Sequence, residues 1–133
     1  MKLALALGIG CDRGTSVSTI ALAVEQALAA CGAGLVDVAA VASIDLKADE
    51  AGLLGYARAN GWKIAFYPAA ELAAVNVPNP SETVRRHTGT PSVSEAAALL
   101  AGAVDTTQLI IEKHRLRGPD GRNATVSIAR MTQ

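Results

Sequence analysis

The sequence predicts an α/β fold: a three-layer α/β/α sandwich around a mixed, mostly parallel, five-stranded sheet with a C-terminal β-hairpin. Over the first two-thirds of the chain, apolar runs alternate with segments of helical periodicity, which is typical of parallel strands joined by right-handed crossovers. In the last third, a short turn-rich link separates two strand-like runs, which predicts the hairpin. The chain has 133 residues, half of them hydrophobic, so we expect residues 1–133 to form a single domain.

Composition and charge exclude several classes of function. The formal net charge is zero, which gives no electrostatic basis for binding nucleic acid or an anionic membrane surface. Aromatic residues make up only 3% of the chain, too few for a base-stacking platform. The apolar run Leu3–Leu7 is too short for a signal peptide, and no stretch is long enough to span a membrane. The two cysteines lack metal-ligand spacing, so we expect a reduced, cytoplasmic protein without a metal or cofactor.

The first strand is expected over Leu3–Leu7 and to end at Gly8. A glycine-spaced loop follows and leads into a helix, and its candidate binding residues are Gly8, Gly10, Cys11, Arg13, Gly14, Thr15 and Ser16. Backbone N–H groups and the positive end of the helix can face an anion there, and glycine allows positive φ or close approach of a ligand. The same glycines are equally compatible with a tight strand–helix turn that serves only packing.

An apolar stripe from Val17 to Cys31 predicts the first helix, which Ser16 or Thr15 can cap and Gly32 ends. Cys31 belongs to that stripe and is interpreted as a small core residue. Cys11 lies in the preceding loop. A nucleophilic thiol is the less favoured interpretation of Cys11, because the sequence shows no neighbouring base.

The second strand is expected at 36–44, where the residues are apolar and rich in β-branched side chains. A polar cluster follows directly, made of Asp45, Lys47, Asp49 and Glu50, and a helix begins after it. Because the carboxyl ends of parallel strands meet at one edge of a sheet, we expect this cluster and the first loop to share a rim. The alternative is that the two acids at the end of the cluster only favour the N-terminus of the next helix.

Short elements complete the chain. A third strand is expected at 63–67 and a short helix at 69–75. The hairpin is formed by a strand at 107–113, a polar turn at 115–122 and a final strand at 124–130.

Two further helix starts lie between 77 and 103. Asn79 precedes a proline and the capping-box residue Glu82, and the segment from Thr90 to Glu95 repeats this arrangement. The intervening basic residues are Arg85, Arg86 and His87. A solvated helix face explains these side chains adequately, and a lone histidine is not a metal site.

Five segments together resemble the CobE family of small cobalamin-biosynthesis proteins, which is related to the C-terminal domain of CbiG. They are GIGCDRGTS at 8–16, SIDLKADEAGL at 43–53, VPNPSE at 77–82, TGTPSVSEAAALL at 88–100 and NATVSIAR at 123–130. The resemblance runs nearly end to end, and the segments occur in the order typical of the family. The N-terminal part that CbiG enzymes carry is absent from the sequence.

The resemblance implies a role in corrin assembly by the oxygen-dependent pathway. The chain would bind or hand on a precorrin intermediate around ring contraction, with other enzymes of the pathway as possible partners. CbiG proteins open the lactone of a cobalt-precorrin, so the alternative that the resemblance implies is a precorrin lactone hydrolase.

The residues themselves suit such a ligand, because a macrocycle edged by carboxylates needs an apolar floor with cations and backbone donors around it. Besides the first loop, the candidate binding residues are Lys47, Asn79, Arg85, His87, Thr90, Ser92 and Lys113. If the chain hydrolyses a lactone, Asp45 or Asp49 would orient the water, and Arg13 or Lys47 would stabilise the oxyanion.

Two other classes of function stay open. A dinucleotide-binding oxidoreductase requires GxGxxG after the first strand, and here the glycines are spaced one residue too far apart, although Asp45 partly mimics the ribose-binding acid. A purely structural partner protein would bind no tetrapyrrole and would co-purify with another enzyme of the pathway.

Overall fold

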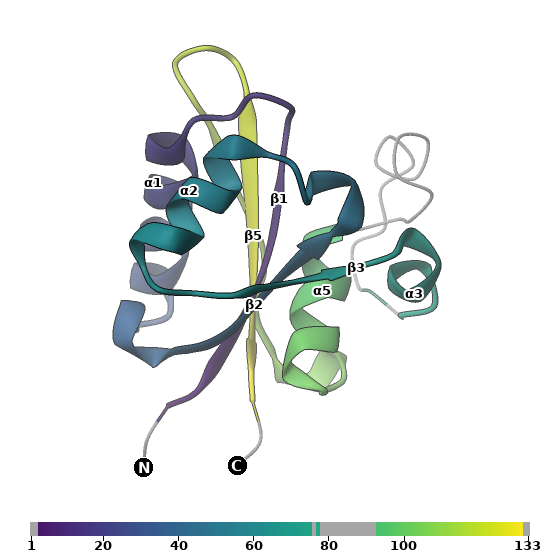
Figure 1. Ribbon diagram of the computed structural model, residues 1–133. Helices are drawn as coiled ribbons and strands as arrows, with labels where there is room; N and C mark the ends of the chain where they lie inside the picture. The colour runs from purple at the N-terminus through teal and green to yellow at the C-terminus, as the bar shows by residue number, and fades with distance from the viewer. Residues whose placement is uncertain (1–2, 76, 78–92, 132–133) are drawn as a thin grey trace.

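The computed structural model describes residues 3–75, 77 and 93–131 of the chain, and in that part five strands form one sheet in the order β3-β2-β1-β5-β4 (Figure 1). The strands are β1 (Leu5–Cys11), β2 (Val38–Ile44), β3 (Ile64–Tyr67), β4 (Leu109–Arg117) and β5 (Asn123–Arg130). The helices are α1 (Val17–Ala30), α2 (Ala51–Ala59), α3 (Ala69–Ala73) and α5 (Val93–Gly102). Three short 3-10 turns complete the described elements: η1 (Leu35–Asp37), η2 (Asp45–Lys47) and η3 (Thr106–Gln108).

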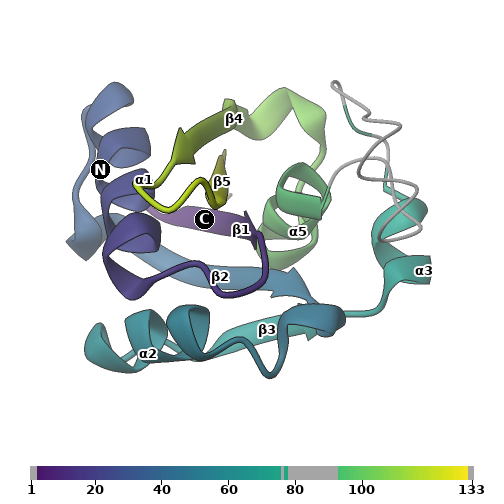
Figure 2. The same cartoon turned by 90° about the horizontal axis from the view of Figure 1, so that it is seen from above.

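The predicted α/β sandwich with a C-terminal hairpin is confirmed. Helices α1 and α2 cover one face of the sheet, and α5 and α3 lie on the other (Figures 1 and 2). Strands β1, β2 and β3 run parallel, whereas β5 is antiparallel to both β1 and β4. Half of the pairings are therefore parallel rather than most of them, because both hairpin strands add to the β1 side of the sheet.

The alternation of side chains along β1 supplies both faces of the core. Leu5, Leu7 and Ile9 are buried in the cluster that packs α1 and α2 onto the sheet. The residues between them turn to α5, where Ala6 is buried with small side chains of that helix. Among the described residues, every helix is too short or too polar to traverse a bilayer.

Strand β1 extends to Cys11, so the prediction that it ends at Gly8 is wrong. Gly8 and Gly10 lie inside the strand, and β5 pairs with β1 along its whole length. A Cβ atom on Gly8 would lie 1.8 Å from the backbone oxygen of Ser94 in α5. The apolar signal stops at Gly8 because the helix packs against the backbone there, and not because the strand ends.

The hairpin turn is shorter than predicted. Strand β4 continues to Arg117, and the turn occupies only 118–122. Gly118 donates its N–H to the carbonyl of Arg122 at 2.7 Å, and Gly121 has a positive φ of 84°. The predicted cap of α1 is confirmed, since Ser16 Oγ accepts the N–H of Thr19 at 3.2 Å.

Candidate functional site

The loops that follow β1 and β2 meet at one edge of the sheet, as the sequence predicts. Arg13, after β1, donates to the carbonyl of Leu46 at 2.6 Å and to the carboxylate of Asp49 at 2.7 Å. This edge lies at the carboxyl ends of both strands, at the top of Figure 1, and we call it the upper edge. The Arg13 guanidinium holds the pKa of Asp49 below its usual value through this hydrogen bond. The cation predicted to face a ligand is thus engaged within the chain.

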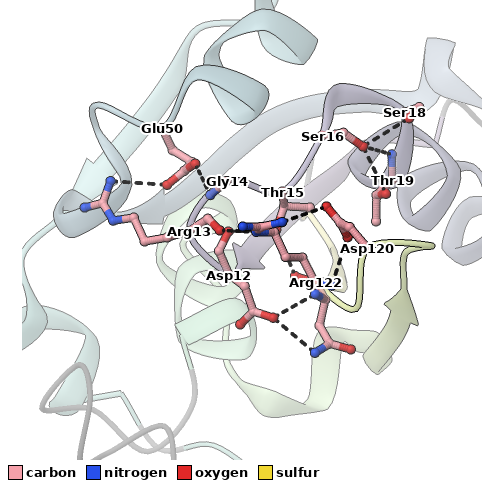
Figure 3. Close-up of polar contacts among 11 residues, drawn as sticks. Asp12, Arg13, Gly14, Thr15, Ser16, Ser18, Thr19, Glu50, Asp120 and Arg122 are labelled. Carbon is pink, nitrogen blue, oxygen red and sulfur yellow. Dashed lines mark hydrogen bonds and ion pairs between the residues drawn. The ribbon is translucent and has the colours of Figure 1, made fainter.

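Glu50 is the central residue of the upper edge, although the sequence predicts it only as one of the acids of the polar cluster and not as a binding residue. Its side chain is only 6% exposed. One carboxylate oxygen accepts the N–H of Gly14 at 2.7 Å, and the other accepts Arg13 at 3.2 Å (Figure 3). Gly14 has a positive φ of 80°, which turns the loop toward this carboxylate. The anion that the first loop binds in this structure is therefore Glu50.

The same loop is tied to the start of β5. The carboxylate of Asp12 accepts the backbone N–H of Asn123 at 2.7 Å and its side-chain amide at 3.1 Å. Arg122, held by Asp120, donates to the carbonyl of Arg13 at 2.8 Å (Figure 3). Loop 12–16 is therefore fixed from two sides, by α2 and by the hairpin.

Thr15 and Ser16 serve local structure in this arrangement. Thr15 is buried, and its hydroxyl donates to the carbonyl of Asp12 at 2.7 Å. A Cβ atom on Gly52 would lie 2.1 Å from the carbonyl oxygen of Thr15, so the first turn of α2 packs directly on the loop. The turn after β1 is rigid, and its glycine Gly14 serves packing as well as conformation. A dinucleotide fingerprint places its glycines in the turn, whereas Gly8 and Gly10 belong to the strand here.

Cys11 and Lys47 lie close together at the upper edge. Burial raises the pKa of the Cys11 thiol to about 11, and the nearby Lys47 ammonium opposes this only in part. A thiol with this pKa is protonated near neutral pH, which disfavours the nucleophile interpretation. In the part of the chain that the structure describes, Lys47 forms no salt bridge. Of the two cations predicted in these loops, Arg13 and Lys47, Lys47 is thus the one whose charge is not paired with a described carboxylate.

The other predicted residues divide into three groups. Asp45 is exposed at the start of η2, next to Lys47 in the chain. Lys113 lies on the α5 side of β4, 3.6 Å from the fully buried carboxylate of Glu95. The remaining residues lie outside the described residues: Asn79, Arg85, His87, Thr90 and Ser92. Their predicted contribution to the site stays a prediction.

A hollow of about 350 Å³ lies between the second half of α2 and β3, away from the upper edge. Trp62 and Phe66 line it together with Arg58 and Lys63, and it contains none of the predicted site residues. In the described residues, no group of three or more His, Cys, Asp or Glu side chains is arranged to hold a metal ion.

Comparison with known proteins identifies the family. The model for the cobalamin synthesis G C-terminus matches residues 5–129. Protein CobE of Sinorhizobium sp is 40% identical over 82% of this chain and 71% of its own length. The cobalt-precorrin-5A hydrolase of Priestia megaterium is 39% identical over 94% of this chain, which spans only 32% of that enzyme.

Solved structures agree with the sequence comparisons. The crystal structure of CobE, a protein from the cobalamin (vitamin B12) biosynthetic pathway, has 34% sequence identity and a TM-score of 0.78. The match covers 99% of this chain and 93% of the CobE chain. Because the family model matches residues 5–129 and the CobE relatives are 34–40% identical over most of this chain, the chain belongs to the CbiG C-terminal family of cobalamin-biosynthesis proteins, which includes CobE.

Proposed function

We propose that the protein binds a precorrin at the upper edge of its sheet and hands it on around the ring-contraction stage of the oxygen-dependent pathway. The observation that carries the proposal is the continuous rim formed when Arg13 bonds to Leu46 and Asp49 across the two strand-end loops. A precorrin is a flat macrocycle edged by carboxylates, so it requires a fixed surface with cations at its margin.

The charges of the rim support an anionic ligand. Arg13 is neutralised within the chain by Asp49 and Glu50, whereas Lys47 has no salt bridge to another described residue. Exposed Leu46, which lies beside Lys47, adds apolar surface at the same place. The free thiols of Cys11 and Cys31 agree with a reduced, cytoplasmic setting.

Lactone hydrolysis is the alternative activity for the same site. It is favoured by the similarity to the cobalt-precorrin-5A hydrolase of Priestia megaterium and by exposed Asp45 beside Lys47, a carboxylate and a cation at one rim. In this version Asp45 would orient the attacking water and Lys47 would stabilise the oxyanion of the opening lactone. Asp45→Asn would then abolish turnover and leave binding intact, and normal turnover of this variant would remove Asp45 from the mechanism.

The test is a titration of the purified chain with isolated precorrins from either side of ring contraction, followed by absorption spectra and mass spectrometry of the products. We expect a saturable spectral change with at least one precorrin, weakened about tenfold in Lys47→Gln because a charged hydrogen bond is lost. Lys63→Gln, a matched exposed lysine at the β3 edge, should bind as the wild type does. Absence of any spectral change, with co-purification of another pathway enzyme, would contradict the proposal and support a structural partner protein.

A further inference from the structure

One face of β4 carries a row of cations that the predicted site includes only in part. His114 hydrogen-bonds to Gln26 of α1 at 2.8 Å, so its side chain lies on the α1 face of the sheet. Lys113 pairs with Glu95 of α5 and lies on the opposite face. Because side chains alternate along a strand, and β4 pairs regularly with β5 from 114 to 117, Arg115 and Arg117 lie on the α5 face.

This row borders a part of the sheet with small side chains. Arg115 pairs with Thr125 of β5, and Thr125 pairs with Gly10 of β1, so the three residues form one line across the sheet. A Cβ atom on Gly10 would have no described neighbour closer than 4.0 Å. One step lower, Gly8 and Ser127 are in contact with α5. Described cover on this face therefore ends at Val93, where α5 begins.

Arg115 and Arg117 differ in their partners from the other two arginines of the upper edge. Arg13 pairs with Asp49 and Arg122 with Asp120. In the described part of the chain, neither Arg115 nor Arg117 forms an ion pair, and both side chains are exposed. The Arg117 guanidinium lies beside Gly121 of the hairpin turn, above the line formed by Arg115 and Thr125.

At the upper edge, Lys47 and Arg115 are thus both cations without an ion pair to another described residue. Lys47 lies beyond the end of β2 and Arg115 on β4, three strand intervals apart in the sheet order. At about 4.8 Å per interval, strands β2 and β4 lie roughly 14 Å apart in the sheet, so the sheet at this edge is as wide as a tetrapyrrole with its side chains. A guanidinium presents paired donors that match a carboxylate in a bidentate geometry.

We propose that Arg115 and Arg117 bind the carboxylates along one edge of the tetrapyrrole, while the ring lies over Gly10 and Thr125. The inference rests on the proposed function and adds the residues that fix the orientation of the ligand.

The test uses uroporphyrin III, a stable tetrapyrrole octacarboxylate, with binding followed by its absorption and fluorescence. Arg115→Gln and Arg117→Gln should each weaken binding about tenfold, and the double variant more, because each loses a charge-assisted hydrogen bond. Arg115→Lys should recover only part of the affinity, since it keeps the charge and loses the bidentate geometry. Arg58→Gln, an exposed arginine of α2, is the matched control and should bind as the wild type does.

Urea unfolding of each variant shows whether weaker binding comes from a lost ligand contact or from a less stable fold. Because Arg115 and Arg117 are exposed, the Arg115→Gln and Arg117→Gln variants should unfold at the same urea concentration as the wild type. Equal affinities of the wild type, Arg115→Gln and Arg117→Gln for uroporphyrin III would overturn this inference, as would the absence of binding by the wild type. The precorrin titration described above decides the proposed function separately. A chain that binds a precorrin equally well with and without these arginines keeps the proposed function and loses this extension of it.

Discussion

Among the described residues, the α5 side of the sheet has a covered part, under α5, and an open part beyond Val93, and the boundary between them falls between Gly8 and Gly10 of the same strand. At Gly8 the backbone of α5 occupies the position where a Cβ atom would stand, and at Gly10 the nearest described atoms lie 4.0 Å from that position. Identical residues two positions apart thus have opposite surroundings. At Gly8 the glycine permits a helix to pack, whereas at Gly10 a side chain would meet no described atom closer than 4.0 Å.

The polar side chains follow the same division. Under α5, the Ser127 hydroxyl donates to the carbonyl of Glu112 at 2.7 Å and shares a second hydrogen bond with the hydroxyl of Ser94 at 2.8 Å. Beyond Val93, Arg115 is exposed and Thr125 is half-buried. A charged or polar residue near a site therefore indicates ligand binding only once its partners within the chain are known.

Substitution of the two glycines gives the largest expected contrast. Gly8→Ala would place a methyl group 1.8 Å from the Ser94 carbonyl, so α5 must move away from the sheet. We expect a loss of about 3 kcal/mol in the free energy of unfolding, at the upper end of overpacking costs. Urea denaturation followed by circular dichroism measures it.

Gly10→Ala is the matched control for this variant. Its methyl group meets no described atom closer than 4.0 Å, so the free energy of unfolding should change by less than about 0.5 kcal/mol. The same methyl group would rise from the proposed tetrapyrrole floor and should weaken uroporphyrin binding. Equal stability losses in the two variants would contradict the division of the sheet into covered and open parts.

The fold was largely predictable because it depends on patterns that act over short distances. The runs around Leu7, Val41 and Ile128 are apolar enough to specify strands, and Ser16 and Gly32 mark the ends of α1 by their local chemistry. The convergence of the two strand-end loops also followed from the rule for parallel strands, and the contact between Arg13 and Asp49 agrees with it.

The partners within the upper edge could not be predicted in the same way. Glu50 reads as an ordinary acid before a helix, and its burial beside Gly14 depends on how α2 packs on loop 12–16. Arg115 falls where the sequence predicts a turn, because Pro119 and the glycines around it outweigh the weak strand pattern of 114–117. Both residues depend on contacts between elements that are distant in the sequence.

The role of Glu50 gives the second prediction, of intermediate size, and tests how firmly loop 12–16 is held at the upper edge. Glu50→Gln keeps an acceptor for Gly14 but turns an amide donor toward the Arg13 guanidinium. We expect a loss of about 1–2 kcal/mol in the free energy of unfolding, because a buried acceptor of charged hydrogen bonds is replaced. Asp49→Asn, whose carboxylate is 77% exposed on the same guanidinium, should leave the urea midpoint unchanged. Similar losses in both variants would show that burial of Glu50 does not decide the strength of the contact.

The smallest expected effect concerns Cys11, which follows Gly10 on the strand and therefore points to the opposite, α1 face. Burial raises its pKa from 9.0 to about 11, so at pH 8 the fraction of thiolate, and with it the rate of alkylation, should be about a hundredfold below that of an ordinary cysteine. A Cys31→Ser background leaves this thiol as the one that iodoacetamide reports, and the rate should rise about tenfold per pH unit until it levels off near pH 11. The unfolded chain releases this proton near pH 9, whereas the folded protein holds it until about pH 11. Ionisation of the thiol therefore favours the unfolded chain, and the free energy of unfolding should fall as the pH rises from 9 to 11. An alkylation rate that levels off near pH 9 in the folded protein would contradict the burial of the Cys11 thiol on the α1 face.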